Sequence, residues 1–238
     1  MLSPTTRQTI SAASWGFRMR ERVLLDNDVL IKMSAWQLGG PLTECLTTAS
    51  GPPAMLGVAA FVIRRKLRKI GLLDPAAAEA AFTRLCESLI LVEPTEEELE
   101  TAAAFEEAAN QADLQFDTGE SQLAAILLHR GAALLATGDK RAIAALAALA
   151  PDELAGRVAS LESLLRHIGT RIGIGQLRSH ICCEPGADRS AAICFACHRE
   201  GTIPLAEVDA CLASYLGDLA KVAEQLLISD AALSALAA

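Results

Sequence analysis

Short apolar runs alternate with segments of helical periodicity along most of the chain. The apolar runs lie at residues 22–28, 54–59, 88–93 and 132–137 and at the start of 156–168. Turn-forming or charged residues bound each run, which is typical of buried strands. The segments between them repeat their apolar positions as amphipathic helices do. Strands that alternate with helices predict an α/β fold with a parallel sheet and crossover helices.

The first helices are predicted from their boundaries. Residues 29–38 form a periodic segment before Gly39-Gly40, so a helix is expected to end there. Residues 61–70 and 75–88 predict two more helices. Thr95 and Glu98 have the spacing of a capping box, which predicts the start of an acidic helix that continues to about residue 110.

The two ends of the chain differ from its middle. Residues 1–21 are polar and are expected to form an N-terminal arm, whereas residues 22–170 contain the strand–helix alternation. Residues 171–238 show only helical periodicity, which predicts a helical C-terminal extension without catalytic acids. The positions expected to share one buried helical face in this extension are Val208, Cys211, Leu212, Tyr215 and Leu219.

Composition and charge limit the function. The 238 residues are 52% hydrophobic, which excludes a disordered chain, and the net charge of −8 argues against unspecific coating of nucleic acid. The most apolar stretch, 121–150, is interrupted by charges, and residues 1–21 lack the apolar core of a signal peptide. We therefore expect a cytoplasmic protein without a membrane span. In a reducing cytosol its seven cysteines are expected to be free thiols rather than disulfides.

Acidic residues fall where strands end or helices begin. They are Asp26, Asp28, Asp117, Glu120 and Asp139. In a parallel sheet these positions share the carboxyl edge, where such folds bind ligands. Crowded carboxylates repel one another, and a hard divalent cation such as Mg²⁺ relieves that repulsion. The alternative is that the Asp residues are only helix N-caps, with Asp28 capping a helix from Val29.

Three segments resemble successive motifs of the PIN-domain family, in the family's order. They are LLDNDVLIK (24–32), FDTGESQLAAILL (116–128) and LLATGDKRAI (134–143), and LESLL (161–165) resembles the segment that ends many such domains. The resemblance covers about residues 22–168. It implies a Rossmann-like parallel sheet and an Mg²⁺- or Mn²⁺-dependent nuclease that often acts on RNA, as in the toxins of bacterial toxin–antitoxin pairs.

The resemblance also assigns roles to the acids. It implies Asp26, Glu120 and Asp139 as catalytic residues and metal ligands, with Asp28 and Asp117 as auxiliary metal ligands. The implied partners are an RNA substrate, with DNA as the alternative, and a protein such as an antitoxin or an operon-encoded subunit.

One position departs from the family pattern. The family usually has a Glu at the start of the helix after the second strand, and here Ala59, Ala60 and Phe61 stand there. The alternative function is therefore a catalytically degenerate PIN-like module that acts as a binding or regulatory subunit.

Basic residues suggest a place for nucleic acid. Arg64, Arg65 and Lys66 lie in the most basic stretch, and Lys140 follows Asp139, so these four could contact phosphates. The alternative, which we favour for the basic stretch, is the solvated face of a helix. Its buried stripe would then be Phe61, Ile63, Leu67 and Ile70.

The cysteines of the extension offer a second candidate metal site. Cys194 and Cys197 have C-x-x-C spacing, and with Cys182 and Cys183 they could supply four zinc ligands, with His180 nearby. Because Cys182 and Cys183 are adjacent rather than a second C-x-x-C, we do not expect Zn²⁺ there. A regulatory or partner-docking role for this extension is a third possibility.

Overall fold

A five-stranded parallel sheet lies at the centre of the protein, whose computed structural model describes residues 22–150 and 152–236. The strands are β1 (Val23–Leu25), β2 (Ala54–Leu56), β3 (Ile90–Val92), β4 (Leu134–Thr137) and β5 (Val158–Ser160). Their order in the sheet is β3-β2-β1-β4-β5. All residues of β1, β2, β4 and β5 are buried, because helices cover both faces of the sheet. The predicted α/β fold with a parallel sheet is confirmed.

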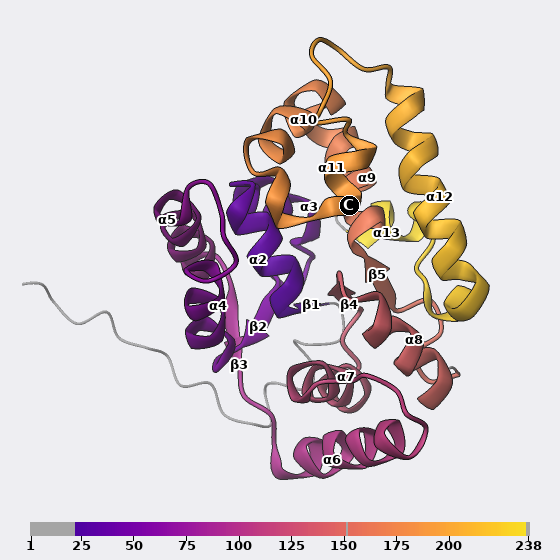
Figure 1. Ribbon diagram of the computed structural model, residues 1–238. Coiled ribbons are helices and arrows are strands. Elements are labelled where there is room, and N and C mark those ends of the chain that lie inside the picture. Colours follow the sequence, from indigo (N-terminus) through magenta and orange to yellow (C-terminus); the bar gives the residue numbers. More distant parts are fainter. Residues whose placement is uncertain (1–21, 151, 237–238) are drawn as a thin grey trace, which may run out of the picture.

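The crossover helices lie in two sets (Figure 1). The first set is α2 (Asn27–Ala35), α3 (Gly39–Leu46), α4 (Ala59–Leu67) and α5 (Pro75–Glu87). The second is α6 (Glu96–Gln111), α7 (Thr118–Arg130) and α8 (Lys140–Leu149). The chain moves outward from β1 to β3 and then returns past β1 to β4. Because such crossovers are right-handed, the reversal places the two sets on opposite faces of the sheet.

Local capping explains where several helices begin. Thr95 and Glu98 form the predicted capping box of α6, and Asp117 and Glu120 form a second one at α7. The first helix differs from the expectation. The strand ends at Leu25 and α2 begins at Asn27, because the Asp26 side chain accepts the first free backbone N–H groups.

The predicted helix over 29–38 is also wrong at its end. The helix stops at Ala35, the chain turns through Gln37 with a φ of 55°, and a new helix starts at Gly39. Gly39-Gly40 therefore begins α3 rather than terminating the preceding helix.

The C-terminal residues form further helices that pack on the sheet region. They are α9 (Leu161–Ile172), α10 (Ile174–Cys183), α11 (Arg189–Cys194), α12 (Leu205–Ala223) and α13 (Asp230–Leu236), with short 3₁₀ turns at Pro185–Ala187 and Glu224–Leu226. Figure 1 shows α12 beside α8, and it also packs on α9. On the predicted face of α12, Val208, Leu212 and Leu219 are buried, whereas Cys211 and Tyr215 are half-buried.

The extension also contacts the sheet and α2 directly. The Ile228 N–H donates to the Val158 carbonyl at 2.9 Å, so the segment after α12 pairs with the edge strand β5. The Trp36 indole at the end of α2 donates to the Glu184 carbonyl at 3.0 Å. These bonds attach the C-terminal helices to the start of β5 and to the end of α2.

The expectation of free thiols is wrong for four cysteines. Disulfides join Cys182 to Cys197 and Cys194 to Cys211, with Cα–Cα distances of 5.1 and 5.2 Å. The packing of α10, α11 and α12 brings these side chains together, which their sequence spacing does not reveal. Cys45, Cys86 and Cys183 remain thiols. Three of the four cysteines considered as zinc ligands are thus bonded in disulfides.

None of the helices within residues 22–150 and 152–236 has the length and apolar character needed to cross a membrane. The N-terminal arm predicted for residues 1–21 lies outside the described residues.

Candidate functional site

The candidate site lies where the strand order reverses, between β1 and β4. These strands are neighbours, yet their following connections leave in opposite directions. The carboxyl edge at such a reversal is where parallel sheets bind ligands. The Asp26 N–H donates to the Ala136 carbonyl at 3.0 Å, so the end of β1 lies against the end of β4. Asp139 follows β4, and Glu120 lies at the start of α7, the helix that leads back into β4.

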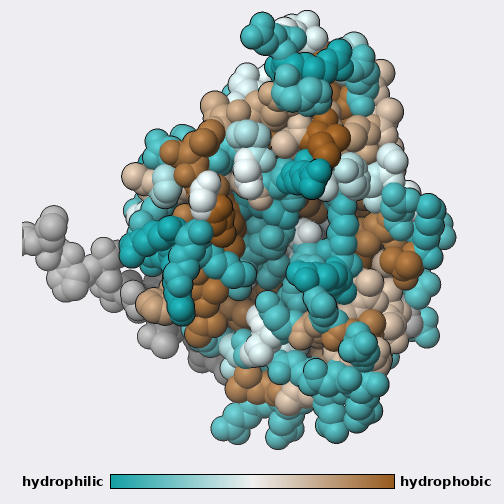
Figure 2. All heavy atoms as spheres, viewed as in Figure 1, coloured by the Kyte–Doolittle hydropathy of each residue, from teal (hydrophilic) through white to brown (hydrophobic). Residues whose placement is uncertain are grey.

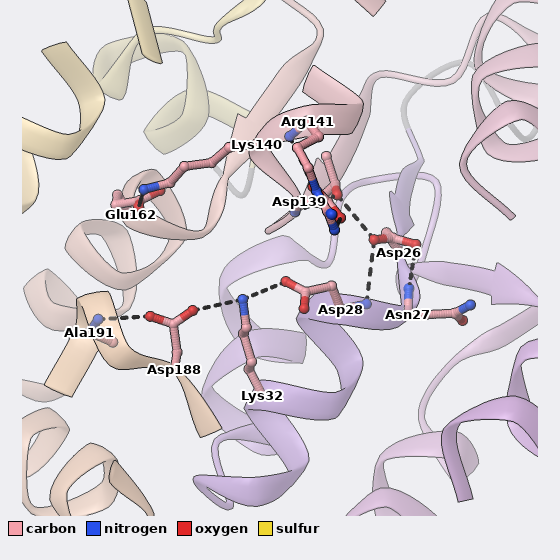
Figure 3. A network of polar contacts seen from close by, with 11 residues as sticks. Asp26, Asn27, Asp28, Lys32, Asp139, Lys140, Arg141, Glu162, Asp188 and Ala191 are labelled. Carbon is pink, nitrogen blue, oxygen red and sulfur yellow. Dashed lines mark hydrogen bonds and ion pairs between the residues drawn. The ribbon is translucent and has the colours of Figure 1, made fainter. Parts of the chain in front are cut away.

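Asp26 is a buried carboxylate directly after β1, and Figure 3 shows its contacts. It accepts hydrogen bonds from the Asn27 N–H at 2.6 Å and from the Thr137 hydroxyl at 3.0 Å. Burial raises its pKa to about 6, although these hydrogen bonds act in the opposite direction. Asp26 therefore keeps its proton to a higher pH than an exposed aspartate does.

Glu120 shows that the three predicted catalytic acids converge. Burial raises its pKa to about 8, the Asp117 N–H acts against that rise, and the charges of Asp117, Asp26 and Asp139 add to it. Thr137 bonds to the Asp26 carboxylate and to the Asp139 N–H, and a Cβ on Gly119 would lie 3.5 Å from the Asn27 amide nitrogen. The ends of β1 and β4 and the start of α7 therefore lie together, and their acids Asp26, Asp139 and Glu120 are called the acidic cluster below.

Asp139 is held by an arginine. It caps α8 by accepting the Arg141 N–H at 2.9 Å, and the Arg141 guanidinium donates to both of its carboxylate oxygens, at 3.1 and 2.7 Å. The same guanidinium donates to the Gln115 side chain at 2.6 Å. Burial acts to raise the pKa of Asp139, but the bonds from Arg141 outweigh it and hold the pKa below its usual value.

Asp28 forms an ion pair with a lysine, Lys32. Lys32 lies one helical turn further on and pairs with Asp28 at 2.6 Å and with Asp188 at 2.8 Å. Asp188 also caps α11 by accepting the Ala191 N–H at 2.8 Å. Figure 3 shows this chain of contacts from α11 through Lys32 to Asp28. Burial lowers the pKa of Lys32, but the two carboxylates outweigh it and raise the pKa overall.

Asp117 and Lys140 both have structural partners. The Asp117 carboxylate accepts the Glu120 N–H at 2.9 Å and so caps α7 beside the cluster. Lys140 turns away from Asp139, pairs with Glu162 at 2.6 Å and lies over the Tyr215 ring at 4.3 Å from its centroid. The candidate phosphate contact at Lys140 is thus a link between α8, α9 and α12.

The basic stretch lies on α4, whose buried face differs from the prediction. Ala59, Ile63 and Leu67 are buried, whereas Phe61 and Ile70, expected in the buried stripe, are 75% and 42% exposed. The predicted stripe was wrong because α4 ends at Leu67, before Ile70, and because residues two positions apart, such as Phe61 and Ile63, point to different sides of a helix. Figure 2 shows brown apolar surface among teal polar surface on the left of this view, over α4 and α5.

The three candidate cations on α4 have different surroundings. Arg64 lies over the Phe82 ring at 5.6 Å, whereas Arg65 and Lys66 are exposed. Arg65 and Lys66 are therefore the α4 side chains available to phosphates.

The sequence interpretation missed Thr137, Lys32 and Arg141. Thr137 donates to Asp26 and accepts the Asp139 N–H at 3.2 Å, so it ties the ends of β1 and β4 together. The spacing of Asp28 and Lys32 is that of a helical ion pair, a signal present in the sequence once α2 is known to begin at Asn27. The position of Arg141 two residues after Asp139 carries no comparable signal.

A cavity of about 860 Å³ lies elsewhere, among α9, α10, α12 and α13. The described residues that line it combine aliphatic side chains, such as Leu212 and Leu233, with the charged Arg166, Asp209 and Asp230. None of the predicted acids is among them. The acidic cluster is therefore separate from the apolar cavity of the C-terminal helices.

The donor chemistry of the cluster fits Mg²⁺ or Mn²⁺, which prefer carboxylate oxygens. Repulsion contributes to the raised pKa of Glu120, and a divalent cation would reverse that contribution. The side chains are not closed around an ion, because Asp139 is turned to Arg141 and Asp28 to Lys32. Over the described part of the chain, no three His, Cys, Asp or Glu side chains are grouped closely enough to hold a metal ion.

Comparison with known proteins found no matching family model, no matching curated protein and no matching solved structure. The assignment of a function therefore rests on the residues and geometry of the site itself.

Proposed function

We propose that the protein is a metal-dependent nuclease, with RNA as the substrate and DNA as the alternative. The observation that carries this proposal is that Thr137 joins Asp26 to Asp139, and that the start of α7 with Glu120 lies beside Asn27, at the reversal of strand order. Acids from three distant parts of the chain meet at the edge where parallel sheets bind ligands. The PIN-like motifs at 24–32, 116–128 and 134–143 support the same reaction.

Each acid has a distinct role in this proposal. Asp26 and Asp139 would hold Mg²⁺ or Mn²⁺, and Glu120 would join them after losing its proton. When bound, such an ion supplies an activated water and stabilises the charge that develops on the phosphate. Thr137 positions Asp26 and the backbone of Asp139 relative to one another. Arg65 and Lys66 would contact the phosphates of a longer substrate.

A degenerate binding module is the second candidate, and one observation favours it. The first turn of α4 carries no acid, so the cluster lacks the Glu that the family usually places there. Such a module would bind RNA or an antitoxin-like protein without cleaving nucleic acid. Both candidates would act in the cytoplasm, where RNA and such partners are found.

The test compares Asp→Asn variants at helix caps inside and outside the cluster. Asp26→Asn and Asp139→Asn keep capping ability, since Asn and Asp rank together as N-caps. Asp74→Asn is the matched control, because Asp74 caps α5 by accepting the Ala77 N–H at 2.8 Å, away from the cluster. Cleavage of labelled RNA and DNA is measured with Mg²⁺, Mn²⁺ or EDTA.

We expect the wild type and Asp74→Asn to cleave with metal and not with EDTA. Asp26→Asn and Asp139→Asn should lose about 100-fold or more in rate, as expected when a group that stabilises transition-state charge is removed. Full activity of Asp26→Asn would overturn the proposal. An inactive wild type that still binds RNA would favour the degenerate module.

A further inference from the structure

We propose that Arg141 is an exchangeable counter-cation of the acidic cluster. In the metal-free protein it neutralises Asp139, and when a divalent cation binds Asp139 it turns to a phosphate of the nucleic acid. This inference rests on the proposed nuclease function, and it adds a phosphate-binding residue that also sets metal affinity.

The contacts of Arg141 place it where it competes with a metal ion. Its Nε and Nη2 atoms donate to Oδ1 and Oδ2 of Asp139, so both carboxylate oxygens face the guanidinium. The Arg141 backbone N–H also donates to Oδ1. A cation coordinated by the same oxygens would meet the guanidinium at close range, where like charges repel. In this geometry the Asp139 carboxylate can therefore bind Arg141 or a divalent ion, but not both.

Arg141 differs from the other cations near the cluster in its freedom to move. Its side chain is 67% exposed, and an exposed pair of this kind is weakly held. The Lys32 side chain is 11% exposed and is fixed between Asp28 and Asp188. Lys140 is fixed by Glu162 and the Tyr215 ring. Among these three cations, Arg141 is the one that a metal ion can displace without breaking a buried contact.

The position of Arg141 suits it to bind phosphate after displacement. It is the second residue of α8, so its Cα stays beside the carboxyl end of β4 while the side chain rotates. A guanidinium presents paired donors that match two oxygens of a phosphate, which an ammonium group cannot do.

The experiment measures Mn²⁺ binding by electron paramagnetic resonance, without any turnover, for the full-length wild type, Arg141→Gln and Arg84→Gln. Arg84→Gln is the matched control, because it removes an exposed cation from the last turn of α5. We expect Arg141→Gln to bind Mn²⁺ roughly three- to tenfold more tightly, since a weak competing ion pair and a like charge are removed. Arg84→Gln should leave the Mn²⁺ affinity unchanged. Thermal melting confirms that each variant is folded.

A second measurement follows a fluorescent RNA oligonucleotide by anisotropy, with Ca²⁺ in place of the catalytic metal. Arg141→Gln should weaken RNA binding about tenfold, as expected for the loss of a charge-assisted phosphate contact. Arg141→Lys keeps the charge but not the paired donors, so its RNA affinity should lie between those of the wild type and Arg141→Gln.

The outcomes separate this inference from the proposed function. Equal Mn²⁺ affinity of the wild type and Arg141→Gln, or unchanged RNA affinity, would overturn the role of Arg141 and leave the nuclease proposal standing. If neither the wild type nor any of the variants binds Mn²⁺, both the nuclease proposal and this inference are overturned.

Discussion

At the scale of single residues, capping and site chemistry are not alternatives in this protein. Asp26, Asp117 and Asp139 each cap a helix, as the simpler interpretation of the sequence predicts. The same three side chains surround Glu120 closely enough to raise its pKa. A helix cap lies at the end of a helix, and in a parallel sheet several such ends meet at one edge. The same carboxylates therefore stabilise the starts of the helices and form the candidate site.

The first prediction concerns Glu120 and the pH dependence of stability. Its pKa is about 8 in the folded protein and about 4.5 in the unfolded chain, so the folded state holds the proton more tightly. This stabilisation is complete below pH 4.5 and is lost as the pH rises toward 8. Glu120→Gln keeps the capping box and removes the buried charge. We expect it to raise the free energy of unfolding at pH 8 by roughly 1–3 kcal/mol.

Glu98 provides a matched control of opposite sign. It occupies the same capping-box position in α6, but both of its oxygens accept hydrogen bonds from Arg130. Burial acts to raise its pKa, and the bonds from Arg130 outweigh that effect and lower the pKa. Its contribution is present at neutral pH and lost as the pH falls through the folded-state pKa. Glu98→Gln should therefore lower the free energy of unfolding at pH 8, whereas Glu120→Gln should raise it. Urea unfolding of both variants from pH 5 to 8 measures the two changes.

At the scale of secondary-structure elements, periodicity and caps predicted most of the site's framework. The strands that end before Asp26 and Asp139, and the helix that starts after Asp117, follow from short apolar runs and turn residues. The start of α2 was misplaced because Asp26 and Asp28 are both plausible caps, and only the three-dimensional contacts distinguish them. The partner of Lys32 in α11 could not be predicted, since Asp188 is distant in sequence and approaches through tertiary packing.

The second prediction concerns the close approach of α2 to the turn after β4. A Cβ atom on Gly138 would overlap Oδ2 of Asp28 and lie 3.2 Å from Nζ of Lys32. Because Lys32 holds Asp28 in place, Gly138→Ala should disturb this ion pair and lower the free energy of unfolding by about 1–3 kcal/mol.

Gly175 in α10 is the matched control for this substitution. No atom lies within 4 Å of the position that its Cβ would take. Gly175→Ala should be neutral or stabilising by up to about 1 kcal/mol, because Ala is the better helix former. Urea midpoints measure both changes, and equal midpoints for Gly138→Ala and the wild type would show that Asp28 moves aside freely.

At the scale of the whole molecule, the C-terminal helices support the acidic edge of the sheet. Asp188 reaches Lys32 beside the cluster, and the Glu184 carboxylate accepts the Leu73 N–H at 2.7 Å near the start of α5. The helical character of this region was predicted from periodicity, but its disulfides were not. Cysteine pairing depends on distances between packed helices, and the expectation of a reducing cytosol pointed the other way.

The last prediction follows from how these disulfides connect the extension. They join residues 15 and 17 positions apart, and loops of this size give about 3 kcal/mol each by restricting the unfolded chain. Reduction with excess dithiothreitol should therefore lower the free energy of unfolding by several kcal/mol, and Cys194→Ser/Cys211→Ser should lose about half of that. Cys183→Ser is the control, because Cys183 is an exposed thiol next to Cys182 and has no disulfide. Thermal melting with and without reductant checks the effect. A melting temperature that reduction leaves unchanged would show that packing alone holds α10, α11 and α12, and that the support of Lys32 by Asp188 does not depend on the oxidised cysteines.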